Sequence, residues 1–168
     1  KNRIILIQKK KIFKSHVSRD VLNGKLKQEA DNEIKDYNSW QLATEKKLDK
    51  SSIEDLEFAN RIVKHSKSNS IVLVKDKQML SSGVGQTSRV DALKFAIEKA
   101  KTFNFDLKGS VMASDAFFPF PDCIEIASEA GIQGVIQPGG SIKDDLSIES
   151  CNQRGISMYL SGTRHFYH

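Results

Sequence analysis

Cysteine, proline and tryptophan are scarce in this sequence. The chain of 168 residues has two cysteines, three prolines and one tryptophan. Cys123 and Cys151 lie far apart, without a Cys-x-x-Cys pair or a histidine at ligand spacing, so the sequence predicts no zinc site. A disulfide between them is the less favoured alternative, because the composition suggests a reducing compartment. A fold held together by disulfides or structural zinc is therefore not expected.

Long hydrophobic runs are also missing. The longest unbroken aliphatic runs are Ile4–Ile7 and Ile71–Val74, whereas a membrane-spanning helix needs about 20 apolar residues. The chain opens on Lys1, and its first segment has neither a long apolar stretch nor a small-residue cleavage site. We expect a soluble, cytoplasmic protein with no membrane partner, and we interpret the chain as an excised piece of a longer one.

Positive charge is concentrated at one end of the chain. Residues 1–15 carry six basic side chains and no acidic one, against a net charge of +5 for the whole chain, so the remainder is close to neutral. A phosphate-binding arm is one interpretation. A short strand at Arg3–Gln8 followed by a solvated lysine turn is favoured, because no aromatic interleaving or nucleic-acid motif accompanies the lysines. We expect no nucleic-acid partner.

The order of expected elements predicts the fold class. Residues 1–50 are irregular, with a second candidate strand around Lys25–Gln28, and Ser51 with Glu54 forms a capping-box pattern that starts a helix. Further helices are expected within residues 87–103, 122–131 and 141–155, and strands at 71–74, 110–114, 134–137 and 156–161, with a polar turn and return after the first strand. This alternation predicts an α/β fold, a three-layer α/β/α domain with a mostly parallel sheet and one core.

Polar and aromatic residues gather in loops at the expected strand ends, where α/β folds bind ligands. The loop Asp115–Asp122 holds three phenylalanines stiffened by Pro119 and Pro121, and these rings are either core or the wall of a site. Arg89 and Arg164 are candidate anion forks. The ring of Phe166, two residues further on, is expected to anchor Arg164. The alternative is a frayed tail, which is the default expectation at a chain end.

Two further loops have structural interpretations that are favoured. Gln137–Ser141 places paired glycines before a helix, a weak anion-binding signal that an ordinary N-cap at Ser141 explains as well. Ser66–Ser70 is rich in small oxygen donors. Its composition alone favours an ordinary turn. The alternative is that its oxygen atoms coordinate a hard monovalent cation.

Five stretches together resemble one known family. They are "SNS", "GVGQTSRV", "GSVMASDAFFPFPD", "VIQPGGSIKDD" and the terminal "RHFYH". They closely resemble the C-terminal half of the transformylase domain in the bifunctional enzymes that join 5-aminoimidazole-4-carboxamide ribonucleotide transformylase to inosine monophosphate cyclohydrolase. The resemblance runs from about Val21 to His168.

The resemblance implies a fold, a reaction and partners. In the family, the transformylase domain is a duplication of two cytidine-deaminase-like α/β/α subdomains, and residues 1–168 look like the second, with 1–50 a less regular lead-in. The reaction moves a formyl group from 10-formyltetrahydrofolate to the amine of the carboxamide ribonucleotide in purine biosynthesis. The co-substrate would be the folate, the parent enzyme a homodimer, and some members carry potassium.

The resemblance also implies roles for particular residues. Asn69 would lie at the transfer centre, and Arg164 would hold the nucleotide phosphate. Phe117 would line the carboxamide pocket, with Phe118 and Phe120 as supporting residues. Arg89 and Asp122 would face the folate. A potassium ion would be bound between the loops Ser66–Ser70 and Asp115–Asp122, by Ser66, Ser68, Ser70 and Asp115.

The sequence departs from the family pattern in ways that bear on activity. The family's Lys-His pair belongs to a Lys-His-x-x-Pro-x-Gly segment that these residues lack, and Lys64-His65 is followed by the wrong residues. Pro121 stands where relatives usually have Arg, and the cyclohydrolase domain is absent. We therefore expect this piece alone to be inactive. A non-enzymatic nucleotide-binding or oligomerisation module is the alternative.

Overall fold

The computed structural model describes residues 5, 7 and 15–167, in two compact units, Lys1–Glu33 and Ile34–His168. The strand expected at Arg3–Gln8 and most of the lysine arm lie outside the described residues. In the first unit, β1 (His16–Val21) pairs antiparallel with β2 (Gly24–Glu29), and every residue of both strands is exposed. The strand expected around Lys25–Gln28 is thus confirmed as part of a hairpin.

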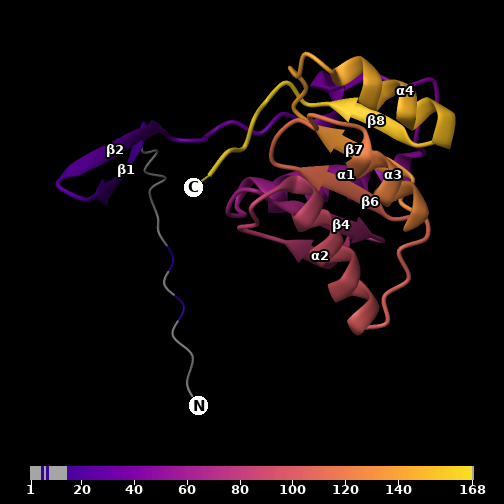
Figure 1. The fold of residues 1–168 in the computed structure, drawn as a ribbon, viewed down its shortest axis with the longest axis horizontal. Coiled ribbons are helices and arrows are strands. Elements are labelled where there is room, and N and C mark those ends of the chain that lie inside the picture. The colour runs from indigo at the N-terminus through magenta and orange to yellow at the C-terminus, as the bar shows by residue number, and fades with distance from the viewer. Residues whose placement is uncertain (1–4, 6, 8–14, 168) are drawn as a thin grey trace. The chain divides into compact units, whose positions relative to one another are not determined.

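The second unit is built on a six-stranded sheet in the order β3-β8-β7-β6-β4-β5 (Figure 1). The strands are β3 (Gln41–Leu42), β4 (Ile71–Lys75), β5 (Gln78–Gly83), β6 (Val111–Ser114), β7 (Gly134–Gln137) and β8 (Ser157–Leu160). The α/β class is confirmed, and the sheet is mixed. Only β6, β7 and β8 pair in parallel, because helices connect them, whereas a two-residue turn forces β4 and β5 to pair antiparallel.

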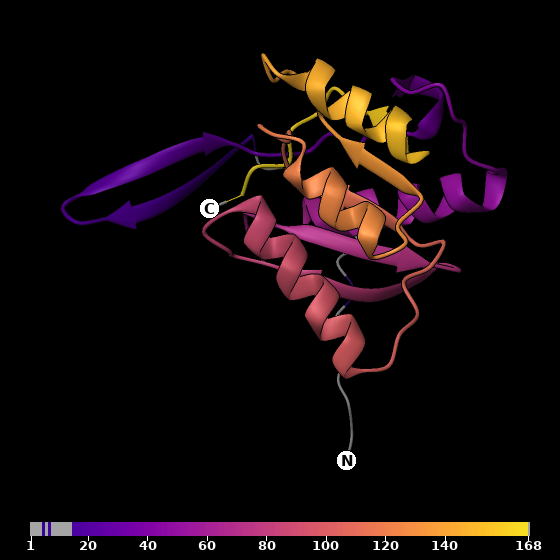
Figure 2. The same cartoon turned by 45° about the vertical axis from the view of Figure 1, so that its right-hand side comes forward.

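Helices cover both faces of this sheet. They are η1 (Tyr37–Ser39), α1 (Lys50–Lys64), α2 (Arg89–Thr102), α3 (Asp122–Glu129) and α4 (Asp144–Arg154). Ile71 and Leu73 of β4 face the core cluster that includes α2 and α3, whereas Val72 and Val74 face the cluster that includes α1. Figure 2 shows α2, α3 and α4 on one side of the strands and α1 on the other. The three-layer architecture is therefore confirmed.

The first helix starts two residues earlier than the sequence pattern indicates. Its N-cap is Asp49, whose carboxylate accepts hydrogen bonds from the Ser52 N–H at 2.8 Å and the Ser51 hydroxyl at 3.0 Å. These bonds lower the pKa of Asp49 below its ordinary value. The capping box predicted at Ser51 is wrong, because an ionised carboxylate is the stronger acceptor at a helix N-terminus and Glu54 pairs with Lys77 instead, at 2.8 Å.

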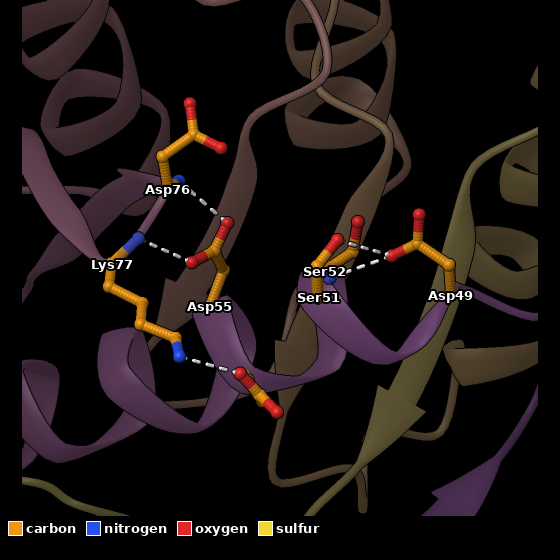
Figure 3. A network of polar contacts seen from close by, with 7 residues as sticks. Asp49, Ser51, Ser52, Asp55, Asp76 and Lys77 are labelled. Carbon is orange, nitrogen blue, oxygen red and sulfur yellow. Dashed lines mark hydrogen bonds and ion pairs between the residues drawn. The ribbon is translucent and has the colours of Figure 1, made fainter.

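A buried carboxylate of α1 fixes the turn between β4 and β5 (Figure 3). Asp76 and Lys77 both have left-handed backbone, with φ of 53° and 58°, a conformation that usually selects Asn-Gly in two-residue hairpins. Asp55, which is 6% exposed, accepts from the Asp76 N–H at 2.9 Å and the Lys77 N–H at 2.6 Å. This clasp ties the helix to the hairpin and offsets the strain of two non-glycine residues. In the described part of the chain, no helix is long and apolar enough to cross a membrane.

Candidate ligand-binding site at one edge of the sheet

Four loops meet at one edge of the sheet. Residues 84–88 follow β5, residues 115–121 follow β6 and residues 161–167 follow β8, so all three leave the carboxyl ends of strands. The serine loop, residues 66–70, instead precedes β4. Because β4 runs antiparallel to its neighbours, with Ile71 opposite Ser114 and Gly83, its amino end lies at the same edge. The mixed sheet is what brings this loop to the others.

The C-terminal residues are tied into this edge by backbone hydrogen bonds. The Ser68 N–H donates to the Tyr167 carbonyl at 2.7 Å, and the Tyr167 N–H donates to the Ser68 hydroxyl at 2.9 Å. Asp115 joins two loops, since its N–H donates to the Ser70 carbonyl at 3.3 Å and its carbonyl accepts from the His165 N–H at 3.0 Å. The described tail is therefore fixed, and the frayed-tail alternative is wrong for residues 164–167.

Asn69 connects the serine loop to the segment that leads into α2. Its side-chain nitrogen donates to the carbonyls of Gln86 at 3.0 Å and Thr87 at 3.3 Å, and the Gln86 N–H returns a bond to the Asn69 carbonyl at 3.2 Å. Arg89 begins α2 two residues after Thr87, behind the N-cap Ser88. These bonds place Asn69 beside the start of the helix that carries Arg89.

Arg89 and Asp115 form a buried ion pair. Nη2 of Arg89 lies 3.8 Å from Oδ1 of Asp115, and the two side chains are 14% and 0% exposed. Among the described residues, neither carboxylate oxygen of Asp115 has a hydrogen-bond partner, nor do Nε and Nη2 of Arg89. Burial lowers the pKa of Arg89, the Asp115 charge raises it, and the nearby Arg164 lowers it again. Two guanidinium groups therefore lie near each other and, among the described residues, only that of Arg89 pairs with a carboxylate, so the excess positive charge suits an anionic ligand.

Aromatic rings hold the second guanidinium. Cζ of Arg164 lies 4.0 Å from the centroid of the Phe166 ring and 5.8 Å from that of Phe117, within the range of cation–π contacts. The expectation that Phe166 anchors Arg164 is confirmed. Phe118 is fully buried core, as expected for a supporting residue. Phe120 is not support, because it is 50% exposed and its ring contacts the Lys143 ammonium at 4.4 Å.

Asp122 stands apart from this cluster. It is the first residue of α3, and its Oδ1 accepts from the Cys123 N–H at 2.8 Å. Within the described chain, no ion pair or further hydrogen bond joins it to the arginines. Its role toward the folate stays a prediction from the resemblance.

Two of the four residues expected to hold potassium have oxygens without hydrogen bonds. The carboxylate of Asp115 and the hydroxyl of Ser70 are buried and lack hydrogen-bond partners among the described residues. By contrast, the Ser66 hydroxyl donates to the Ile62 carbonyl at 3.0 Å, and the Ser68 hydroxyl accepts from Tyr167. Hard oxygen donors of this kind fit a monovalent cation in part, with Asp115 and Ser70 as the better candidates.

The paired glycines before α4 are already capped by the protein itself. Oδ2 of Asp144 accepts from the Gly140 N–H at 2.7 Å and the Ser141 N–H at 3.1 Å. The N-cap of α4 is Lys143, whose N–H donates to the Ser141 hydroxyl at 3.2 Å, so the N-cap expected at Ser141 is wrong by two residues. The structural interpretation of this turn is confirmed, because its N–H groups already bind a carboxylate.

The two cysteines are free and buried, so the disulfide alternative is wrong. Burial raises the pKa of each thiol to about 12. In the described part of the chain, no group of three His, Cys, Asp or Glu side chains is placed to bind a metal.

The counterion of Arg89 and the hydrogen bonds that hold the C-terminal residues could not be predicted from the sequence. Asp115 was expected only as a cation ligand, and its pairing with Arg89 depends on β4, β5 and β6 lying side by side, which no local pattern reveals. The hydrogen bonds from Ser68 to Tyr167 join residues 99 apart in the chain. The one available signal was the resemblance, which put Asn69, Arg89, Phe117 and Arg164 in a single site.

The fold and this edge define an α/β/α domain whose loops gather two arginines, a buried carboxylate and an aromatic wall. The family model described as AICARFT/IMPCHase bienzyme matches residues 1–99. The chain is 59% identical, over its whole length, to the bifunctional purine biosynthesis protein PurH of Bacteroides thetaiotaomicron, of which it covers 33%. It is 51% identical over 148 residues to PurH of Aquifex aeolicus, covering 88% of this chain and 29% of that protein.

The chain therefore belongs to the AICARFT/IMPCHase bienzyme family of purine biosynthesis proteins. It spans about a third of the length of the curated relatives that it matches. Among solved structures it is similar to the dCMP deaminase of cyanophage S-TIM5, at 18% identity and a TM-score of 0.45, over 62% of this chain and 92% of that one. A deaminase/reductase of Thermotoga maritima gives 23% identity and a TM-score of 0.42, over 62% and 33%.

Proposed function

We propose that this chain supplies part of the formyltransferase site of a bifunctional purine biosynthesis enzyme, taking 10-formyltetrahydrofolate and the carboxamide ribonucleotide as substrates. The observation that carries the proposal is the meeting of Asn69, Arg89, Phe117 and Arg164 through four loops at one edge of the sheet. The excess positive charge there suits two anionic substrates. The proposed parent enzyme is a cytoplasmic homodimer.

The chemistry sets what such a site must do. The substrate amine is a poor nucleophile, because its lone pair is delocalised toward the carboxamide. Its nitrogen attacks the formyl carbon of the folate, the tetrahedral intermediate carries a negative oxygen, and the nitrogen loses a proton. The bond from carbon to the folate nitrogen then breaks, and that nitrogen takes up a proton. Orientation, proton transfer and oxyanion stabilisation are the three contributions an enzyme can make.

The residues of this chain supply orientation and charge. Arg164 would hold the ribonucleotide phosphate, because a guanidinium binds such dianions through charge-assisted hydrogen bonds. Phe117, beside it, would line the carboxamide pocket. Arg89 would face the folate, and Asn69 would lie where the formyl group passes. A potassium ion, where present, would be held by Asp115 and Ser70 and would support these loops.

Proton transfer is the contribution that the resemblance assigns to a Lys-His-x-x-Pro-x-Gly segment. The 168-residue sequence does not contain that segment, and such an acid–base step typically contributes about 10²- to 10⁴-fold. We predict that the purified 168-residue chain gives no formyl transfer above the uncatalysed rate, whereas the full-length protein turns over. Spectrophotometric detection of tetrahydrofolate in both preparations is the test. Turnover by the short chain would overturn the prediction, and an inactive full-length protein would overturn the proposed function itself.

A further inference from the structure

A single aromatic ring contacts both arginines of the site. Cζ of Arg164 lies 4.0 Å from the centroid of the Phe166 ring, and Cζ of Arg89 lies 5.9 Å from the same centroid. Both distances fall within about 6 Å, the range in which a cation is attracted to the face of a ring. Arg89 begins α2 and Arg164 lies in the C-terminal segment, so the ring joins residues from distant parts of the chain.

The backbone on both sides of Phe166 is fixed. The preceding residue, His165, donates its N–H to the Asp115 carbonyl at 3.0 Å. The following residue, Tyr167, exchanges two hydrogen bonds with Ser68, at 2.7 and 2.9 Å. Because hydrogen bonds hold the residues on both sides of Phe166, its ring is a rigid platform. The arginine side chains can lie against it without the ring itself having to lose further conformational entropy.

The charges explain why a platform is needed. Arg89 is anchored by its ion pair with Asp115 at 3.8 Å and is mostly buried. Arg164 is exposed, and no carboxylate in the part of the chain that the structure describes pairs with it. Its charge lies close enough to Arg89 to lower the pKa of Arg89. Repulsion alone would drive Arg164 outward into solvent. The negative face of the Phe166 ring offsets this repulsion and keeps both guanidinium groups at the same site.

We propose that Phe166 is a positioning residue shared by Arg89 and Arg164, which sets the spacing of the two guanidinium groups that receive the two substrates. This inference rests on the proposed function for the identity of the ligands. The geometry itself, one ring facing two guanidinium groups, does not depend on the proposed function. Substituting the ring should therefore affect both arginines, whereas substituting Arg164 should affect one substrate only.

The ligand-independent test uses ring-current shifts in the 168-residue chain. In the wild type, the side-chain protons of Arg164, and to a smaller extent those of Arg89, should resonate upfield of exposed arginines such as Arg61. Phe166→Leu should return both sets toward the exposed values, and Phe166→Tyr should keep them. The matched control is Phe103→Leu, because Phe103 is 62% exposed and its ring contacts Phe105. A shift at Arg164 with none at Arg89 would overturn the shared platform.

The functional test measures affinities in the full-length protein. Phe166→Leu should weaken ribonucleotide binding about threefold to tenfold and folate binding about twofold, in line with the strength of cation–π contacts and the longer distance to Arg89. Phe166→Tyr should restore both affinities. Unchanged affinities in Phe166→Leu would overturn the positioning role. If the wild type binds neither substrate, the proposed function fails, and the ring-current result still decides whether Phe166 spaces the arginines.

Discussion

The ion pair between Arg89 and Asp115 is the part of the site whose energy the structure defines best. Nη2 of Arg89 lies 3.8 Å from Oδ1 of Asp115, with 14% and 0% of the side chains exposed. At an effective dielectric constant of about 20, this separation gives an attraction of roughly 4 kcal/mol. The distance is too long for a hydrogen bond, and Arg89 keeps some access to water, so the loss on breaking the pair should lie somewhat lower.

We therefore expect Asp115→Asn, which keeps the shape and removes the charge, to lower the free energy of unfolding by about 2–3 kcal/mol. Arg89→Met should also destabilise, because it leaves Asp115 charged and buried. The double variant should lose about 2 kcal/mol less than the sum of the single losses, because neither charge is then left unpaired. This coupling is what distinguishes an interacting pair from two independent packing residues.

Urea unfolding followed by tryptophan fluorescence is a suitable assay. Trp40 is the single tryptophan of the chain and is 9% exposed, so its emission should report loss of the core. Additive losses in the double variant, within about 0.5 kcal/mol, would refute the reasoning. They would mean that the two charges are solvated separately in solution, and the excess positive charge of the site would need another explanation.

Two further outcomes follow from the fold. Asp55→Ala should lower the free energy of unfolding by about 2–3 kcal/mol, because it removes two charge-assisted hydrogen bonds to residues with left-handed backbone. Glu54→Ala, on the same helix, should change the free energy of unfolding little, because its ion pair is exposed. Equal losses for the two variants in urea titrations would contradict the role of Asp55 in fixing the turn. Cys123 and Cys151, with pKa values near 12, should resist iodoacetamide at pH 8 in the folded chain and react once urea is added, as followed by mass spectrometry. Rapid alkylation of the folded chain would contradict their burial.

The helices and buried strands could be predicted from the sequence because their signals are local. Residues such as Leu56 and Leu93 recur at helical spacing, and both are fully buried in the structure. The N-cap of α1 was placed wrongly because Asp49 and Ser51 are both good caps, and local pattern alone does not rank them. The parallel share of the sheet was overestimated because strand direction depends on pairings between distant segments.

The candidate site shows the same division between local and distant signals. The positions of Arg89 and Arg164 in loops at the expected strand ends indicated two candidate anion forks, and the neighbouring ring of Phe166 could be expected to hold the second one. The pairing of Arg89 with Asp115 could not be expected, because it depends on α2 starting opposite the end of β6. The ordering of the C-terminal residues could not be expected either, because it depends on hydrogen bonds to Ser68 and Asp115.

The proposed function depends most on whether Arg164 belongs to a binding site for the ribonucleotide phosphate. Calorimetric titration of the full-length protein and its Arg164→Ala variant with each substrate separately tests this directly. Arg154→Ala is the matched control, because the Arg154 guanidinium in α4 pairs with Glu125 in α3 at 3.2 Å. We predict that Arg164→Ala weakens ribonucleotide binding about tenfold or more, since one charge-assisted hydrogen bond contributes about 1.5–3 kcal/mol, and leaves folate affinity nearly unchanged. Ribonucleotide affinity equal to that of the wild type would contradict the claim.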